Sequence, residues 1–146
     1  MPIRPEHRGY YPIDWRELSA AIRFGRARGR CEHCGRPHGA RVRHLADGRW
    51  FDETRSLWRD GRGRLLRKRL PEPCKIVDDV PPSTTVVRLA CAHLDQDTAN
   101  NAASNLAALC QRCHLNHDRP WNLAKRRRTL RMRRALGDLF DGPYPL

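Results

Sequence analysis

The first regular pattern of apolar positions lies near the start of the chain. Between Leu18 and Ile22 the apolar residues recur three and four positions apart, which is the spacing of one helix face. Asp14 precedes this stretch, and Glu17 follows Asp14 by three residues, as in a capping box. The pattern predicts a helix over residues 14–28. Residues 1–13 are rich in Pro and Arg and predict an extended arm.

In the middle of the chain the helical spacing of apolar residues is lost, and a strand-like composition follows. Residues 40–80 carry scattered aromatic residues among Gly, Pro and Arg, which predicts a loop-rich insertion with room for one helix or hairpin. Residues 84–93 are rich in Thr and Val and predict one β-strand. A polar loop follows over residues 95–104, and apolar character returns over residues 105–109.

The last part of the chain returns to a helical spacing and carries a dense run of basic residues. Residues 114–118 predict the opening of a helix, Pro120 interrupts it, and residues 121–136 predict a second helix. Residues 119–146 are then a basic helical tail. Since there is no internal repeat and no clear boundary, the pattern predicts a single domain of the α+β class over residues 1–146.

Composition adds a basic charge and a small core to this picture. The chain has 146 residues, of which 39% are hydrophobic, and a net charge of +13 from 29 Lys+Arg against 16 Asp+Glu. A chain with so few hydrophobic residues needs an additional cross-link, such as a structural metal ion, to be stably folded. A basic excess of this size is typical of proteins that bind polyanions, nucleic acid above all. Arg enrichment from a GC-rich genome is the alternative explanation.

Four of the six cysteines form two CxxC pairs that lie far apart in the sequence. The first pair is Cys31 and Cys34, and the second is Cys110 and Cys113. Each pair places two thiolates at neighbouring corners of a tetrahedron, so the two pairs predict a closed, structural zinc site. Disulfides or a redox CxxC are the alternatives. Cys91, within the predicted strand, is expected to be a small buried residue.

The sequence carries no signal for export or for membrane insertion. No apolar run approaches the roughly 20 residues that span a bilayer, and residues 1–8 lack the apolar stretch of a secretory signal. We therefore expect a cytoplasmic protein without a membrane partner. A reducing cytoplasm favours cysteines that bind metal over cysteines that form disulfides.

Around the second CxxC pair the sequence carries a wider series of motifs. In chain order the motifs are CEHCG, then CAHLDQD, then NNAASNLAALCQRCHLNHD. Their order and spacing resemble the HNH endonucleases (the ββα-metal nucleases), in particular the zinc-containing bacterial and phage members. The dense part of the resemblance covers residues 84–118, together with the first CxxC pair. The resemblance implies a ββα core stapled by the four-cysteine zinc site, with flanking helices, in a DNA-cutting protein of bacterial or phage origin.

The resemblance also implies a role for individual residues. His93 falls at the position of the general base. Asn105 falls at that of the Asn that braces the loop and orients this His, and His114 falls at a ligand position of the catalytic divalent ion. A neutral imidazole with a fixed tautomer has a suitable basicity to deprotonate water. With Mg²⁺ or Mn²⁺ as the Lewis acid, the implied activity is metal-dependent hydrolysis of DNA phosphodiester bonds.

The sequence departs from the family pattern at one position. Many HNH proteins have Asp or His directly before the general base, as a metal ligand, whereas this chain has Ala92. Asp95 or Asp97 from the loop, or His117 from the helix that begins near His114, are the candidates to complete the divalent-ion site. The alternative is a catalytically weak or inactive zinc-stabilised module of the same fold that binds nucleic acid.

The basic tail supplies the candidate nucleic-acid contacts. Residues 119–134 contain eight Lys/Arg and no acidic residue, which is typical of an element that tracks phosphates. A solvated charged face, or a surface for an acidic protein partner, is the alternative, and the sequence leaves homodimerisation open. The residues expected to contact DNA are Lys125, Arg126, Arg127, Arg128 and Arg131.

Overall fold

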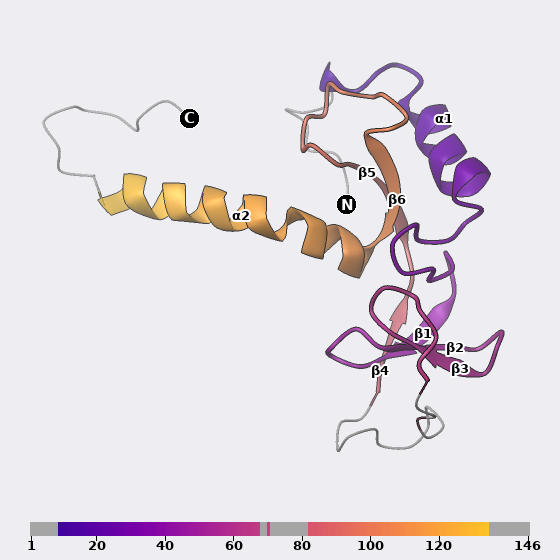
Figure 1. Ribbon diagram of the computed structural model, residues 1–146. Coiled ribbons are helices and arrows are strands. Elements are labelled where there is room, and N and C mark those ends of the chain that lie inside the picture. Colours follow the sequence, from indigo (N-terminus) through magenta and orange to yellow (C-terminus); the bar gives the residue numbers. More distant parts are fainter. Residues whose placement is uncertain (1–8, 68–69, 71–81, 135–146) are drawn as a thin grey trace, which may run out of the picture. The chain divides into compact units, whose positions relative to one another are not determined.

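The structure, a computed structural model, describes residues 9–67, 70 and 82–134 (Figure 1). The chain divides into two compact units, Met1–His114 and Leu115–Leu146, and each is described by itself. The described elements are helices and antiparallel strands, so the predicted α+β class is confirmed. The single HNH-type domain and its specific ββα-metal core stay predictions.

The N-terminal helix lies within the predicted stretch 14–28 and changes its winding halfway. α1 (Trp15–Ala20) is α-helical and continues into η2 (Ala21–Arg26), a π-helix. Asp14 takes the N-cap position, but its side chain makes no capping hydrogen bond, so the predicted capping box is wrong. The first turn is closed by backbone hydrogen bonds, among them the 3.0 Å bond from the Leu18 N–H to the Asp14 carbonyl.

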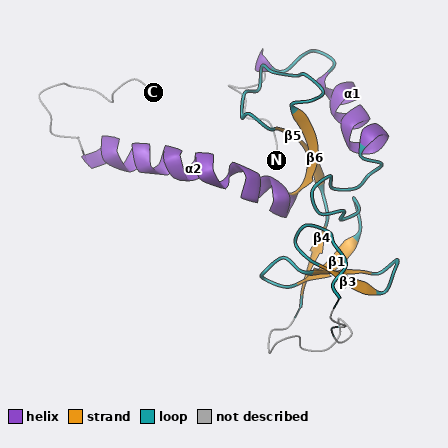
Figure 2. Cartoon of the chain, in the orientation of Figure 1, coloured by secondary structure: helices purple, strands orange, loops and turns teal. Residues whose placement is uncertain are grey.

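A two-stranded antiparallel hairpin provides much of the core of the first unit (Figure 2). β5 (Leu89–His93) pairs with β6 (Leu106–Cys110) over all five positions, with His93 opposite Leu106. Every residue of β6 is buried, and η2 packs against both strands. One apolar cluster joins these elements, and it includes Ile22, Val42, Trp50, Val87, Leu89, Leu106, Leu109 and the four paired cysteines.

The described part of the insertion contains three short strands of a β-sheet, where the sequence predicts a loop-rich stretch with room for one helix or hairpin, and residues 68, 69 and 71–80 of the predicted insertion lie outside the described residues. β1 (Arg41–His44), β2 (Trp50–Asp52) and β3 (Leu57–Arg59) form a four-stranded antiparallel sheet with β4 (Ser83–Val86). The strand order is β3-β2-β1-β4. Strands of three or four residues contain too few alternations of apolar and polar positions for the pattern to stand out in the sequence.

Two tryptophans anchor this sheet from its opposite faces. Trp50 is 1% exposed and belongs to the core of the hairpin, whereas Trp58 is 4% exposed and packs with Leu45 in a second, smaller cluster. Phe51 follows Trp50 on β2 and pairs with Trp58 in the register. Because successive strand residues point to opposite faces, the two indole rings lie on opposite sides of the sheet. Trp50 thereby joins the insertion to the hairpin core.

The single strand predicted over residues 84–93 is two strands in two different sheets, separated by Val87 and Arg88. The Gln111 side chain accepts a 3.0 Å hydrogen bond from the Arg88 N–H and donates a 2.8 Å bond to the Val86 carbonyl. Gln111 thus satisfies the backbone groups on one side of the chain at the break, while Val87 bonds to the Ala40 carbonyl and the Gly39 N–H on the other side. The residue types here all favour strands, so the sequence pattern carries no sign of it.

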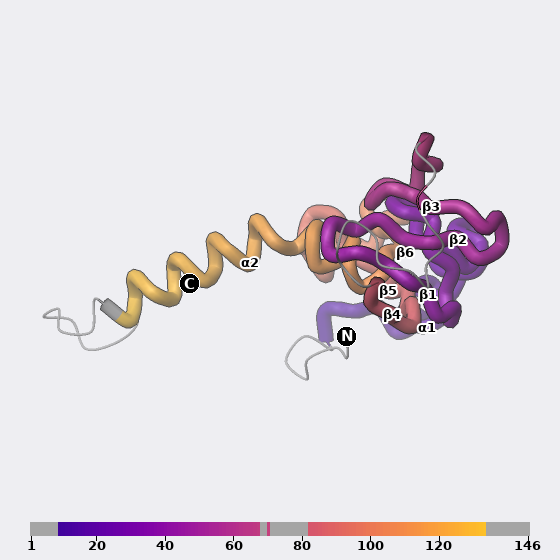
Figure 3. Tube along the Cα trace, turned by 90° about the horizontal axis from the view of Figure 1, so that it is seen from below, coloured from indigo at the N-terminus to yellow at the C-terminus, as the bar shows by residue number. Residues whose placement is uncertain are grey.

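α2 (Gln111–Arg134) follows β6 directly and runs as one helix through Pro120 (Figure 3). The prediction of two helices separated at Pro120 is therefore wrong for the described residues. Proline removes one intrahelical hydrogen bond, but strong helix formers on both sides, such as Leu115 and Ala124, favour the continuous helix. The first turn of α2, up to His114, belongs to the first unit, and the rest belongs to the second.

Two turns of the insertion approach the CxxC segments closely at glycines. Gly63 has a φ of +84°, and a Cβ at this position would lie 2.6 Å from the Cys34 carbonyl oxygen. Gly48 has a φ of +98° and lies against the Arg112 guanidinium, which donates a 2.9 Å hydrogen bond to the Asp47 carbonyl. Since Cys34 belongs to the first CxxC pair and Arg112 lies inside the second, these contacts tie the insertion to both pairs.

We expect Gly63→Ala to destabilise the folded protein by about 2 kcal/mol, because alanine would adopt a strained positive φ and meet the Cys34 carbonyl. Urea unfolding followed by circular dichroism measures the loss. Gly25→Ala is the matched control, since a Cβ at Gly25, within η2, meets nothing within 4 Å. The control should lose no stability. Equal stability of the two variants would contradict the close approach at Gly63.

Candidate metal centre and active site

The four paired cysteines meet in one buried cluster, as the sequence predicts. Their Sγ atoms all lie within 4.8 Å of one another, and Cys34 Sγ is 3.6 Å from Cys110 Sγ. Tetrahedral zinc with Zn–S bonds of about 2.3 Å places its sulfurs about 3.8 Å apart. The cluster could therefore hold a metal ion such as zinc. Among the described residues, it is the one group of three or more His, Cys, Asp or Glu side chains that is close enough to do so.

The electrostatics of the cluster call for a cation. Two thiolates about 4 Å apart repel each other by about 4 kcal/mol at an effective dielectric constant of about 20. The thiols share protons instead, and hydrogen bonding with Cys110 lowers the pKa of Cys31 while it raises the pKa of Cys113. Hydrogen bonding with Cys110 also raises the pKa of Cys34. A bound divalent cation would remove this conflict, because it stabilises all four sulfurs as thiolates.

Neighbouring groups of the protein lie within hydrogen-bond distance of two of the sulfurs. The Cys110 N–H lies 3.3 Å from Cys31 Sγ, and His33 Nδ1 lies 3.5 Å from Cys113 Sγ. Donors of this kind reduce the negative charge of a thiolate-rich metal site. Gly35, with a φ of +74°, allows the tight turn in which its N–H donates to the Cys31 carbonyl at 2.8 Å. The donor set therefore fits a metal ion held by four thiolates, with His33 beside it.

Glu32, inside the first CxxC pair, fastens that turn to the hairpin. Its N–H donates to the Ala108 carbonyl at 2.9 Å, and its carboxylate accepts a 2.7 Å bond from the Ala108 N–H. One residue thus satisfies both backbone polar groups of Ala108 on β6. A hydrogen bond from Arg26 lowers the pKa of the Glu32 carboxyl below its ordinary value, so this group is a carboxylate at neutral pH.

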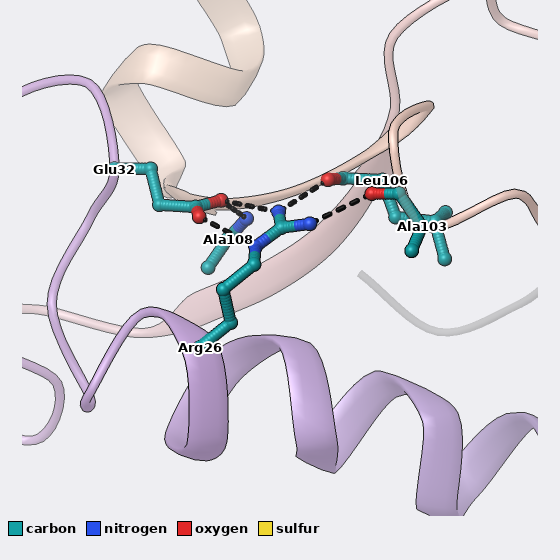
Figure 4. Close-up of polar contacts among 5 residues, drawn as sticks. All are labelled: Arg26, Glu32, Ala103, Leu106 and Ala108. Atoms are coloured by element: carbon teal, nitrogen blue, oxygen red, sulfur yellow. Dashed lines mark hydrogen bonds and ion pairs between the residues drawn. The ribbon is translucent and has the colours of Figure 1, made fainter.

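Arg26, at the end of η2, extends this link to the loop between the two strands (Figure 4). Its Nε and one Nη each donate a 2.8 Å bond to a Glu32 carboxylate oxygen. The same guanidinium donates to the carbonyls of Ala103 and Leu106. A guanidinium presents its donors in a fixed planar fork, which a lysine cannot reproduce. Arg26 therefore joins the helix, the CxxC turn and the end of the β5–β6 loop in one network.

His93 ends β5 in a buried, aromatic environment. The residue is 8% exposed, and its ring stacks on Trp15 with the centroids 5.2 Å apart and an interplanar angle of 11°. Tyr11 meets the ring edge-on with the centroids 5.8 Å apart. These contacts hold the imidazole in one orientation.

Asn101 determines which nitrogen of His93 carries the proton. The Asn101 Nδ2 donates to the carbonyls of Thr98 and Ala99, and its Oδ1 lies 3.0 Å from His93 Nε2. A carboxamide oxygen only accepts hydrogen bonds, so the Nε2 atom must be the protonated one. The neutral ring then carries its lone pair on Nδ1.

Asn105 braces the loop, as expected, and it does so through Asp95. Its Oδ1 accepts a 3.1 Å bond from the Asp95 N–H, and its Nδ2 donates 2.8 Å bonds to the Asp95 carboxylate and the Asn100 carbonyl. The bond from Asn105, with further bonds in the loop, holds the pKa of the Asp95 carboxyl below its ordinary value. The hydrogen bond to His93 comes from Asn101, so the structure separates the two roles that the family resemblance assigns to Asn105.

The other predicted ligands of a catalytic ion are spread over the described residues. The register places His93 at the opposite end of the hairpin from Cys110, and His114 follows Cys110 in the first turn of α2. His117 lies in the second unit, and Asp95 is exposed in the loop. Apart from the cysteines, no three described His, Cys, Asp or Glu side chains come together as a metal site. Cys91 is half-buried, and not buried as predicted.

Sequence reasoning missed three contacts that build this site. A glutamate inside a CxxC turn is a signal that a basic partner lies near, but nothing in the spacing identifies Arg26 as that partner. The family motif assigns the orientation of His93 to one Asn, whereas the loop contains three, Asn100, Asn101 and Asn105. The sequence alone does not show which of them bonds to His93. The helical spacing can place Trp15 on the apolar face of the helix, but its stacking on His93 depends on how helix and hairpin pack.

In the second unit, the candidate nucleic-acid contacts lie on α2. The Lys125 Nζ lies over the ring of Trp121, 5.2 Å from the ring centroid. The predicted contact residues are all exposed, so their charges face solvent, and these residues are Lys125, Arg126, Arg127, Arg128 and Arg131.

Comparison with protein-family models, with curated proteins and with solved structures finds no significant match. Within the part of the chain that the structure describes, no helix combines the length and the apolar character needed to cross a membrane. The chemistry of the site therefore has to be inferred from its own residues and their geometry.

We expect Asn101 to set the tautomer of His93 in solution. In protein labelled with ¹⁵N-histidine, two-bond ¹H–¹⁵N spectra of the neutral ring should show a protonated Nε2 and an unprotonated Nδ1. Asn101→Asp keeps an oxygen acceptor and should keep this tautomer, whereas Asn101→Leu should give a mixture of both. Asn101→Asp also removes the Nδ2 donors to Thr98 and Ala99, so it separates the loop bonds from the bond to His93. An unchanged tautomer in Asn101→Leu would show that Asn101 does not set it.

Proposed function

We propose that the protein is a zinc-stabilised, metal-dependent HNH-type endonuclease that hydrolyses DNA phosphodiester bonds. The observation that carries the proposal is the arrangement of the hairpin. His93, with one nitrogen fixed by a hydrogen bond, ends the first strand, an Asn105-braced loop follows, and His114 lies in the first turn of the helix after the second strand. This order of parts resembles that of the HNH nucleases, in which a histidine of this kind activates water.

His93 is the proposed general base. Hydrolysis needs a group that takes a proton from water near neutral pH, and a neutral imidazole is suited to this. Asn101 occupies Nε2, so Nδ1 would receive the proton while the water oxygen forms a bond to phosphorus and the bond to the 3′-oxygen breaks. A base whose tautomer and orientation are fixed by neighbours is a recurring feature of hydrolytic sites. Here Asn101 and Trp15 would supply these constraints.

A divalent ion, Mg²⁺ or Mn²⁺, would supply a Lewis acid at the phosphate. His114 is its proposed protein ligand, and Asp95 and His117 are the further candidates. Mg²⁺ in phosphoryl-transfer sites keeps several waters and binds through one or two protein groups together with substrate phosphates. A dense cluster of protein ligands is therefore not required for the proposal.

The four-cysteine cluster is proposed to hold zinc in a structural role. Its four positions would all be filled by the thiolates of Cys31, Cys34, Cys110 and Cys113, which leaves no open position for a reacting water. Reduced cysteines of this kind suit a cytoplasmic protein. The net charge of +13 and the exposed basic residues of α2 support DNA as the partner.

A module of the same fold that binds nucleic acid without cutting it is the second candidate. Ala92 favours it, because this residue is 2% exposed and pairs with Ala107 across the hairpin. Its side chain has no ligand atom, at a position where many HNH proteins hold the catalytic ion.

The test is nicking of supercoiled plasmid DNA by the zinc-loaded protein, with Mg²⁺, Mn²⁺ or Ni²⁺ and without an added ion. We expect nicking that depends on the ion, and a loss of at least about 100-fold in His93→Ala, because the general base is removed. His44→Gln is the control. His44 Nε2 bonds to Thr85 Oγ1 in the insertion sheet, and glutamine can make a similar bond.

Undiminished cutting by His93→Ala would rule out His93 as the general base. If no ion supports nicking, while DNA binding remains salt-sensitive and zinc remains bound, the second candidate is correct and the nuclease proposal fails. Zinc content and DNA binding should be the same in His93→Ala and in the parent protein.

A further inference from the structure

The basic residues of α2 surround the helix on all sides. A residue advances about 100° around an α-helix, so Arg126 and Arg128 project about 200° apart. Every residue from Arg119 to Arg131 is exposed, and residues 119–134 include no Asp or Glu. The cations of this segment with described side chains are Arg119, Lys125, Arg126, Arg127, Arg128, Arg131 and Arg133.

This distribution does not suit a flat partner. A helix that lies on a membrane or packs on a protein needs an apolar face, with its charges on the opposite side. Leu123 and Leu130 are seven residues apart and share one side of α2, but Arg127 lies between them on that same side. Pairing with a second copy through this side would place one Arg127 against another.

A groove with negative charge on both walls suits the distribution better. The major groove of B-DNA is about 12 Å wide, and an α-helix with its side chains is about 10–12 Å across. A helix in this groove has phosphates on both sides, so cations that project in opposite directions can each meet one. The basic segment 119–134 of α2 has 16 residues, and at about 1.5 Å per residue it is about 24 Å long, which is about two thirds of one turn of DNA.

Other nucleic acids fit this helix less well. The major groove of A-form RNA is deep and narrow, so a helix does not enter it readily. Proteins that bind single strands stack bases on exposed aromatic rings. Between Arg119 and Arg134 the chain has one aromatic residue, Trp121, and the Lys125 ammonium lies over its ring.

We infer that residues 119–134 bind in the major groove of double-stranded DNA, with arginines on opposite sides of the helix contacting the two phosphate walls. The inference rests on the proposed binding of nucleic acid and specifies its class as duplex DNA. Contacts of this kind position the protein on DNA without reading its sequence.

The experiment measures binding of the zinc-loaded full chain by fluorescence anisotropy over a range of salt concentrations, without added Mg²⁺. The probes are one labelled duplex DNA, the same sequence as a single strand, and the corresponding duplex RNA. The variants are Arg126→Gln and Arg128→Gln, on opposite sides of α2. Arg55→Gln, an exposed arginine of the insertion, is the control.

We expect the duplex DNA to bind most tightly. Arg126→Gln and Arg128→Gln should each weaken its binding several-fold and lower the slope of log K against log salt by about 1, because each removes one phosphate contact. The control should bind like the parent protein.

A loss confined to one of the two variants would overturn the groove inference, because it indicates a one-sided surface. Equal or tighter binding of single-stranded DNA or of duplex RNA would overturn it as well. In these cases DNA nicking that depends on His93 would leave the nuclease proposal standing. If the protein binds none of the probes and does not nick DNA, both the groove inference and the nuclease proposal are wrong.

Discussion

The crowding of four cysteine sulfurs is the constraint on which the first unit depends. Cys34 and Cys110 are separated by 76 positions in the sequence, yet their sulfurs are 3.6 Å apart. Thiolates at this spacing stay together only with a cation between them. The insertion meets the same region, because Gly63 packs on the Cys34 carbonyl and Arg112 donates to the Asp47 carbonyl. The insertion sheet, the hairpin and the two CxxC turns are thus all held together at the cysteine cluster, in a chain with a small core.

The constraint reaches the other end of the hairpin through a short series of hydrogen bonds. Glu32 lies inside the first CxxC turn, and its carboxylate accepts a hydrogen bond from Arg26. Arg26 in turn donates to the carbonyl of Leu106. Leu106 lies opposite His93 in the strand register. The residue across from the proposed base is therefore connected to the cysteine cluster, although the cysteines lie at the far end of the hairpin. A metal ion held by the four cysteines would thereby contribute to the orientation of the loop that carries Asn101.

Prediction from the sequence succeeded where a spacing alone defines the structure. The CxxC pairs have one simple way to meet, and the apolar spacing near Leu18 predicts the helix. Prediction failed where the structure depends on packing between segments that are distant in the sequence. The three-residue strand at Trp50 is too short to show a period, and the backbone at the break after Val86 bonds to Gln111, which lies 25 positions away in the sequence. The family motif points to Asn105, whereas the partner of His93 is recognised only from the geometry of the loop.

The central claim is that one metal ion, bound by the four cysteines, organises the fold of the first unit. Titration of the metal-free protein with Co²⁺ tests this claim most directly. The absorption spectrum and the circular dichroism are recorded together at each addition. We predict one Co²⁺ per chain, with the intense thiolate-to-cobalt bands of a tetrahedral four-sulfur site, and folded structure that grows in step with these bands. Weak bands of an octahedral site, or full structure before any metal is added, would contradict this role of the cluster.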